Sequence, residues 1–327
     1  MSKELNNKGG GPEPWSNQPL FSAQLENCAC CPRRCGVNRL AGETGFCCIG
    51  DRVLLCHAGL HHGEEPPISG VRGSGTLFFA GCNLACVFCQ NYQISQQFNV
   101  RHTQALTTDQ LASEMLCLQD AGAHNINLVS PTHVAWQTAD AIVASRRRGL
   151  DIPIVYNSNG YDSVDVLRQI RGLVQIYLPD IKYLDNTLAN RYSGVADYAE
   201  VIPAVLREML DQVGTLEVDR RGVAIRGVLV RHLVLPGHLD NSRRCLRVLA
   251  DLDPNIHVSI MSQYSPQFRA RLFPEIGRRL TAREYRAITD YALLVGLENA
   301  FIQKLASQEA WLPDFDQEQP FDADVIG

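Results

Sequence analysis

The chain has 327 residues, of which 45% are hydrophobic and 20% are charged, and its formal net charge is -5 at pH 7. These values fit a soluble enzyme with one large buried core. The acidic balance gives no general attraction to nucleic acid or to an anionic membrane, and no run of 18 apolar residues is present to span a bilayer. We therefore expect neither nucleic acid nor a membrane among the partners.

Twelve cysteines would suggest disulfides in a secreted protein. No apolar signal segment follows Met1, however, and the chain is long for a disulfide scaffold. We therefore expect the reducing cytoplasm and free or metal-bound thiols.

The composition divides the chain into four expected parts. Residues 1–20 are rich in glycine and proline, cannot pack a core and are expected to form a disordered tail. Residues 21–70 form a small Cys-rich metal-binding module, residues 71–310 a barrel domain, and residues 311–327 an acidic C-terminal tail.

In the Cys-rich module, Cys28, Cys31, Cys35 and Cys47 supply four ligands within a short, glycine-containing stretch. Four thiolates at this separation can close a tetrahedral zinc site or hold a four-iron cluster. The adjacent Cys30 and Cys48 leave other ligand sets open.

Short apolar runs then alternate with helical patterns, which is typical of an α/β fold whose parallel strands are joined by crossover helices. We predict strands at residues 76–80, 126–129, 154–156, 176–178, 228–234 and 257–260. We predict helices at residues 108–121, 163–170 and 198–213. Pro203 interrupts the last pattern, so that helix begins either at residue 198 or later.

Three cysteines follow the first predicted strand: Cys82, Cys86 and Cys89, in the spacing Cys-x3-Cys-x2-Cys. Thiolates this close in sequence converge on one metal centre. Three cysteines ligate three corners of a four-iron cube and leave the fourth iron open to a non-protein ligand, which indicates chemistry rather than electron storage. A structural zinc site is less suitable, because it normally has four protein ligands.

Polar residues also follow the other five predicted strands, or lie on them. Each group alone has an ordinary explanation, such as a turn or a helix cap. Their shared position is more informative, because active sites of parallel barrels lie at the carboxyl ends of the strands. The groups are Ser130-Pro131-Thr132-His133, Asn157-Ser158-Asn159-Gly160, Pro179-Asp180-Ile181-Lys182, His232 with Leu235-Pro236-Gly237, and Met261-Ser262-Gln263-Tyr264.

The three-cysteine motif, with Phe88 before its last cysteine, is similar to that of the radical S-adenosylmethionine (SAM) superfamily. Over residues 28–303 the chain resembles the PflX-type radical SAM proteins, relatives of pyruvate formate-lyase activating enzymes and neighbours of the AmmeMemoRadiSam group. The similar stretches lie at residues 64–70, 73–76, 81–95, 156–161, 177–183, 230–237 and 261–264.

The resemblance implies a partial (β/α)6 barrel, open on one side, with a 4Fe-4S cluster and SAM as cofactors. There, one electron cleaves SAM to methionine and a 5'-deoxyadenosyl radical. An external donor such as flavodoxin or ferredoxin is the implied partner. The implied cofactor contacts are Phe88 with adenine, Asn157, Ser158 and Asn159 near the ribose or a cation, and Asp180, Lys182 and His232 with the polar groups of SAM.

The chain departs from the activating enzymes at two positions. Their Gly-Gly-Glu-type motif, which receives the SAM amino group, is replaced by the turn that begins at Ser130, whose hydroxyl can accept a hydrogen bond without a fixed charge. Asn157 stands where they have an aspartate. The resemblance therefore does not imply that pyruvate formate-lyase is the substrate of this chain.

Three functions remain open. The radical could abstract hydrogen from a glycine of a partner protein, as in glycyl-radical activation. It could instead modify a peptide or small metabolite, in a pocket lined by His133, Gln263 and Tyr264. A carrier or scaffold would hold its iron-sulfur cluster without cleaving SAM.

Overall fold

The structure is a computed structural model that describes residues 20–97, 103–305 and 312–321. Of the tail predicted at residues 1–20, only Leu20 belongs to the described part. Its N–H donates a hydrogen bond to Asp140 Oδ1 (2.6 Å), and the next residue, Phe21, stacks on Trp136. The Cys-rich module is thereby attached to the domain that follows it.

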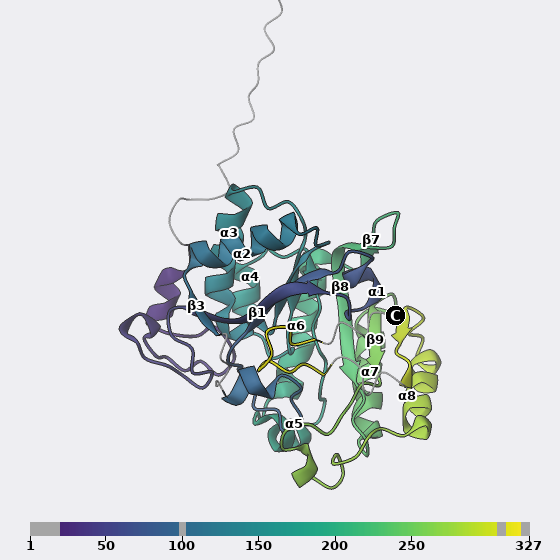
Figure 1. Ribbon diagram of the computed structural model, residues 1–327. Coiled ribbons are helices and arrows are strands. Elements are labelled where there is room, and N and C mark those ends of the chain that lie inside the picture. Colours follow the sequence, from purple (N-terminus) through teal and green to yellow (C-terminus); the bar gives the residue numbers. More distant parts are fainter. Residues whose placement is uncertain (1–19, 98–102, 306–311, 322–327) are drawn as a thin grey trace, which may run out of the picture.

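One ten-stranded sheet organises the molecule, and it is mostly parallel (Figure 1). The strand order is β10-β9-β8-β6-β5-β4-β2-β1-β3, with β7 paired to β8. Bounds are β1 Val53–His61, β2 Ser74–Phe79, β3 Gln104–Leu106, β4 Ile126–Val129, β5 Ile154–Asn157, β6 Ile176–Tyr177, β7 Glu217–Val218, β8 Ala224–Leu233, β9 His257–Met261 and β10 Ala300–Ile302.

All six predicted strands are confirmed, as β2, β4, β5, β6, β8 and β9, and each pairs in parallel with its neighbour. The α/β class is confirmed with them. Strand β10 adds a further parallel strand beside β9, while β1 pairs antiparallel with β2, and β3 with β1. Within the described residues β3 and β10 form opposite edges of the sheet, so the sheet is open.

Helices cover the outer face of this sheet (Figure 1). The α-helices are α1 Pro66–Ser69, α2 Thr108–Asp120, α3 Ala135–Arg147, α4 Val164–Gln169, α5 Asn186–Ser193, α6 Tyr198–Val213, α7 Leu239–Leu252 and α8 Ala282–Leu294. Short 3-10 or π turns are η1 Ser22–Glu26, η2 Arg39–Ala41, η3 Gln93–Gln97, η4 Pro131–Val134 and η5 Ala270–Leu272.

The predicted helices are α2, α4 and α6. Helix α6 begins at Tyr198 although Pro203 lies inside it, so the later start is not needed. Proline removes one backbone hydrogen bond. The fully buried Ile202, Val205 and Leu206 on this helix offset that loss by their packing.

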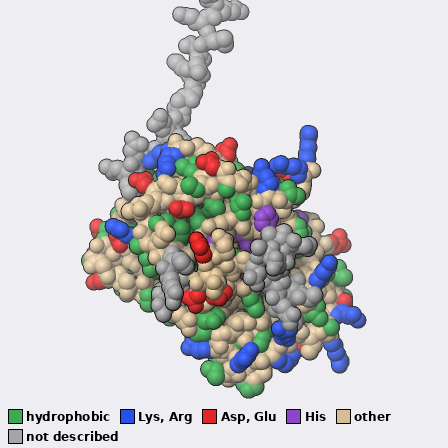
Figure 2. Space-filling model, viewed as in Figure 1, with side chains coloured by type: hydrophobic (Ala, Val, Ile, Leu, Met, Phe, Trp, Pro, Cys, Tyr) green, Lys and Arg blue, Asp and Glu red, His purple; other side chains and the backbone are tan. Residues whose placement is uncertain are grey.

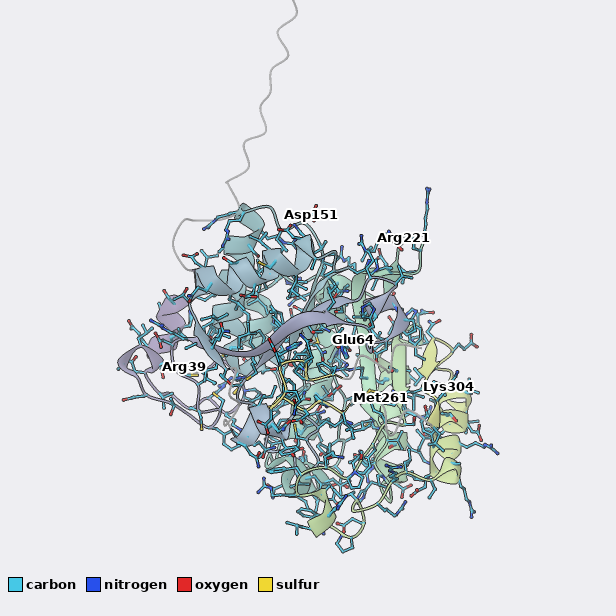
Figure 3. The ribbon with its side chains drawn as sticks, in the orientation of Figure 1. Arg39, Glu64, Asp151, Arg221, Met261 and Lys304 are labelled. Carbon is cyan, nitrogen blue, oxygen red and sulfur yellow. The ribbon has the colours of Figure 1, made fainter. Side chains whose placement is uncertain are left out.

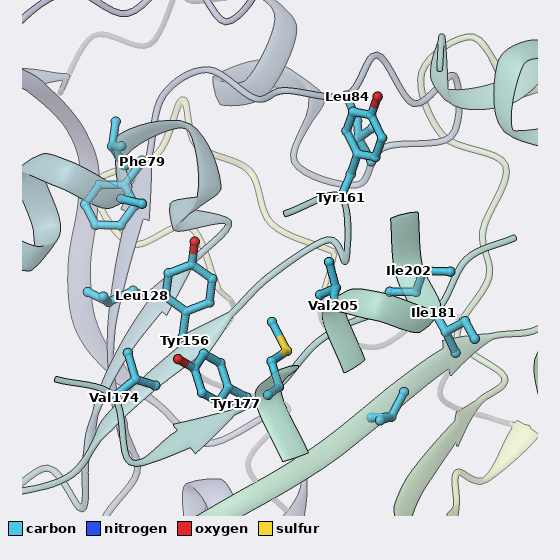
Figure 4. Packing of buried hydrophobic residues seen from close by; sticks show 14 of the residues in the cluster. Phe79, Leu84, Leu128, Tyr156, Tyr161, Val174, Tyr177, Ile181, Ile202 and Val205 are labelled. Carbon is cyan, nitrogen blue, oxygen red and sulfur yellow. The ribbon is translucent and has the colours of Figure 1, made fainter. Parts of the chain in front are cut away.

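The core lies between the sheet and these helices. Figure 4 shows Tyr156 and Tyr177 from adjacent strands beside Leu128 and Val174, with Val205 of α6 nearby. No helix among the described residues has the length and apolar character needed to cross a membrane.

Residues 312–321, within the stretch predicted as an acidic tail, pack against the sheet. Phe315 is 1% exposed and contacts Phe78 of β2. Phe321 contacts His61 of β1 and the same Phe78. In Figure 1 this yellow segment lies near the middle of the view.

Candidate functional site

A cavity of about 470 Å³ lies on the inner face of the sheet. Residues from the C-terminal halves or ends of β2, β4, β5, β6, β8 and β9 line it, so the sheet curves around it. The predicted site residues that it brings together are Cys82, Cys86, Phe88, Cys89, Ser130, Asn157, Ser158, Asn159, Asp180, Lys182 and Gln263.

The cysteine loop starts at Gly81, directly after β2. Gly81 has a φ of +81°, and a Cβ there would lie 2.6 Å from the carbonyl oxygen of Cys47. Only glycine fits this close approach. The chain can therefore turn from β2 into the cavity, where Cys82 is the next residue.

Each of the three thiols has a polar neighbour. Cys82 Sγ accepts hydrogen bonds from the Leu84 N–H (3.4 Å) and from Asn159 Nδ2 (3.5 Å). Cys86 shares a hydrogen bond with the Ser193 hydroxyl (3.0 Å), and Cys89 one with the Ser95 hydroxyl (3.3 Å). These groups can donate to thiolate sulfur and so fit a metal-bound state.

Burial opposes ionisation of these thiols in the absence of a cation. It raises the pKa of Cys82 to about 12 and that of Cys89 to about 11, and it raises the pKa of Cys86 as well. A metal centre would supply the positive charge that stabilises the thiolates. Three buried or partly buried thiols that line one cavity therefore fit a cluster that is ligated by three cysteines.

A charged group forms another part of the cavity wall, and it adds Arg231 and Glu64 to the predicted Asp180 and Lys182. Asp180 accepts hydrogen bonds from Lys182 and from Arg231 Nε (3.2 Å). Arg231 also binds Glu64 (3.1 Å) and Asn157. Burial raises the pKa of Asp180, but the two cations outweigh it and hold that pKa below its ordinary value. Asp180 is therefore ionised and holds both cations in place.

Glu65 adds a second carboxyl beside Glu64. Its Oε2 is buried and has no hydrogen-bond partner among the described residues. Burial raises the pKa of both glutamates, although the Arg231 cation opposes the shift. Both residues line the cavity, and Figure 3 shows Glu64 near the middle of the molecule. Their signal in the sequence is a pair of acidic residues that follows the largely apolar run 53–61 after His62 and Gly63.

A buried carboxylate joins two of the predicted turns. Asp162 accepts hydrogen bonds from Thr132 (2.7 Å), Ser158 (2.6 Å) and Tyr156 (3.1 Å). It thus fixes the turn after β4 against the turn after β5. The spacing of Ser130 and Ser158 at the cavity depends on this residue.

Three of the residues predicted to contact SAM or the substrate are absent from the cavity lining: His133, His232 and Tyr264. His133 Nε2 lies 2.8 Å from the Ala80 carbonyl oxygen, and His232 Nδ1 lies 2.7 Å from that of Ile181. Burial lowers the pKa of each histidine to about 4, so both are neutral at pH 7.

Tyr264 is 1% exposed, and its hydroxyl donates to the Ile276 carbonyl oxygen (2.6 Å). Its ring lies edge-on to Phe88, with centroids 5.8 Å apart. Phe88 lines the cavity, so Tyr264 supports the cavity wall from behind.

The model of the radical SAM superfamily matches residues 76–216. The uncharacterized protein MJ0674 of Methanocaldococcus jannaschii is 32% identical over 277 residues, which cover 82% of this chain and 75% of the relative.

Among solved structures, SuiB of Streptococcus suis bound to S-adenosylmethionine matches with a TM-score of 0.47 and 13% identity, over 70% of this chain and 50% of that one. SuiB bound to its precursor peptide SuiA matches with a TM-score of 0.46 and 12% identity, over 68% and 47%. The chain thus spans about half the length of these structures.

Proposed function

Because this chain belongs to the radical SAM superfamily, we propose that it cleaves SAM reductively and uses the product radical to abstract hydrogen from a substrate in the cavity. The observation that carries this proposal is that three thiols, the buried Cys86 and the partly buried Cys82 and Cys89, line one cavity that has polar walls. When bound, the 4Fe-4S cluster supplies the electron that converts SAM to methionine and a 5'-deoxyadenosyl radical.

The side chains around the thiols have a positioning role in this proposal. Asn159, Ser193 and Ser95 hold the sulfurs by hydrogen bonds. Such outer contacts orient metal ligands and tune their basicity. An external one-electron donor, such as flavodoxin or ferredoxin, supplies the reducing electron.

The groups that receive SAM follow from chemistry and position. Lys182 can donate a charged hydrogen bond to a carboxylate, and Phe88 offers an aromatic face for adenine. Ser130 and Asn157 offer oxygen acceptors to an ammonium group. Tyr264 and His133 serve as positioning residues, the first behind Phe88 and the second at the end of β2 through Ala80.

A polar small molecule or peptide is the preferred substrate class. Glu64, Glu65 and Arg231 line the cavity with buried charge. Glu64 and Arg231 are paired with each other, whereas Glu65 Oε2 is buried without a hydrogen-bond partner among the described residues. The methylene group of a glycine offers no donor to this oxygen, and leaving a buried polar atom unpaired is costly. The wall therefore favours a substrate with polar or ionised groups over glycyl-radical activation.

An anaerobic electron paramagnetic resonance (EPR) experiment tests the proposal. The protein is reconstituted with iron and sulfide and reduced with dithionite, and its EPR spectrum is recorded before and after SAM is added. We expect SAM to change the spectrum, because it binds the open iron. Cys86→Ala should abolish this response, whereas Cys117→Ala, at an exposed thiol on α2, should preserve it.

The alternative is an iron-sulfur carrier. A reducible cluster whose spectrum is indifferent to saturating SAM would favour that alternative. It would also contradict the proposed open iron.

A further inference from the structure

In the cysteine-rich stretch of residues 28–48, backbone contacts place Cys28, Cys35 and the approach to Cys47 on neighbouring turns. The Cys28 N–H donates to the Val37 carbonyl oxygen, and the Gly36 N–H donates to that of Cys28, both at 3.0 Å. Cys35 is thereby brought back beside Cys28. A Cβ at Gly45 would lie 2.7 Å from Cys35 Sγ, so the turn that leads to Cys47 packs on the same group.

Two of the six cysteines in this region have other hydrogen-bond acceptors. Cys30 Sγ is buried and donates to the Thr132 carbonyl oxygen (3.2 Å). Cys48 Sγ is directed to the Phe46 carbonyl oxygen (3.7 Å) in an exposed residue. These contacts direct Cys30 toward the turn after β4 and Cys48 toward its own turn, whereas Cys31 and Cys47 each lie within electrostatic reach of Cys28. Four thiols remain as a ligand set: Cys28, Cys31, Cys35 and Cys47.

Arg39 lies among these cysteines and is 2% exposed. Its Nη1 donates to the His133 carbonyl oxygen (2.9 Å) and its Nη2 to Cys47 Sγ (3.5 Å), and it contacts Cys28 as well. Its Nε is buried without a hydrogen-bond partner in the described part of the chain. Figure 3 shows Arg39 near the edge of the molecule, away from Glu64.

A buried guanidinium stays charged, and its charge needs an anion nearby. Within the described residues no carboxylate lies at ion-pair distance from Arg39. The groups that surround it are cysteines. Neutral thiols would leave the charge without a counterion, whereas thiolates would supply one.

We propose that Cys28, Cys31, Cys35 and Cys47 bind a second metal centre, a four-thiolate site whose negative charge Arg39 offsets. Four thiolates around a doubly charged core, either a zinc ion or a four-iron cluster, leave a net charge of about -2. One buried arginine offsets half of it. The Arg39 Nε–H, which has no acceptor among the described residues, and the Nη2–H would donate to the metal-bound sulfurs.

A zinc ion and a four-iron cluster require different distances between the four sulfurs. Among the described residues, no three His, Cys, Asp or Glu side chains are already gathered closely enough for a single ion. A zinc ion would therefore draw the four sulfurs inward. A four-iron cluster binds each sulfur to a different iron and holds them further apart.

This centre would brace the cavity from outside. The Cys47 carbonyl oxygen meets Gly81, one residue before the first cluster ligand Cys82. Cys30 and Arg39 hold the carbonyl oxygens of Thr132 and His133, in the turn that begins with the cavity residue Ser130. Its existence does not depend on SAM cleavage.

Metal analysis of the full chain tests the site. The triple variant Cys82→Ala/Cys86→Ala/Cys89→Ala removes the first cluster, and zinc, iron and sulfide are then measured after anaerobic purification and after reconstitution. We expect about one zinc per chain, or about four iron and four sulfide, and the ratio identifies the metal. Adding Cys31→Ser should remove that metal, while adding Cys48→Ser should not. A triple variant without stoichiometric metal under both conditions would overturn the proposal.

The role of Arg39 is tested on the same background by the rate at which a chelator removes the metal. Arg39→Gln should accelerate removal about tenfold or more, as expected for the loss of an outer contact to a metal site, while Arg39→Lys should retain part of the protection. Circular dichroism of both variants establishes that they are folded. If a folded Arg39→Gln variant and its parent lose the metal to the chelator at equal rates, Arg39 does not offset the charge of the site. If Arg39→Gln does not fold, the cysteine variants still test the site itself.

Discussion

Lys182 is the residue on which the proposed SAM site depends most. It is the one lysine between residues 9 and 303, and it lines the cavity bound to Asp180. We predict that Lys182→Met raises the SAM dissociation constant about tenfold to a hundredfold, because a charge-assisted hydrogen bond worth about 1.5–3 kcal/mol is lost. Binding is measured anaerobically on the reconstituted protein by titration with SAM.

Lys304→Met is the matched control, since Lys304 is exposed and its side chain is absent from the cavity lining. Both variants replace one lysine by methionine, so they have the same composition and the same net charge. Equal affinities of both variants would show that Lys182 has no part in SAM binding.

Residue type alone predicted which side chains can do chemistry, but not which of them face the cavity. Cys82, Phe88 and Asp180 do, because they follow parallel strands directly. His133 and Tyr264 have suitable chemistry, yet His133 Nε2 lies at the Ala80 carbonyl oxygen and the Tyr264 hydroxyl donates to that of Ile276, both outside the cavity. The local sequence predicts only that Arg231 lies in a strand. It gives no sign of the ion pairs, because Glu64 and Asp180 come from distant segments.

At the scale of elements, α8 offers a test of local electrostatics. Thr281 and Glu284 form a reciprocal capping box, and Arg278 binds the same glutamate at 2.6 Å. The hydrogen bonds from Arg278 hold the pKa of Glu284 well below its ordinary value, although partial burial opposes them. A carboxyl with a lowered pKa stabilises the fold above its ordinary pKa and loses that contribution as the pH falls.

Glu284→Gln should therefore lower the free energy of unfolding by about 1 kcal/mol at pH 7, and by less at pH 3. Thermal unfolding at both pH values measures the difference. Glu298→Gln, at an exposed glutamate outside any helix, should have little effect at either pH. A loss from Glu284→Gln that is the same at pH 3 and pH 7 would contradict the charged cap.

Local patterns predicted the six central strands because their apolar runs are short and bounded by polar turns. They did not reveal β10, which has three residues, or β1, whose apolar run lies within the Cys-rich region. Both strands are defined by pairing with distant segments. Likewise, the acidic composition of their segment does not predict that Phe315 packs on β2 and Phe321 on β1.

For the whole molecule, the curved sheet is what turns separate loops into one site. Its parallel strands deliver the cysteine loop, the turn at Asn157 and the pair at Asp180 to one cavity. The charged side chains on the visible outer face are not gathered at one site as those of the cavity are. Figure 2 shows Lys and Arg mainly near the edge of the visible face and mixed with Asp and Glu, so the residues coloured there form no continuous basic surface. We therefore assign the proposed function to the cavity.

The most direct measurement is the formation of 5'-deoxyadenosine. The protein is reconstituted anaerobically, reduced with dithionite and incubated with SAM, and the nucleoside is quantified by chromatography alongside iron and sulfide. The account predicts 5'-deoxyadenosine from the parent and none from Cys82→Ala, Cys86→Ala or Cys89→Ala. A fully loaded cluster that binds SAM without releasing 5'-deoxyadenosine, or that cleaves a different carbon–sulfur bond, would contradict it.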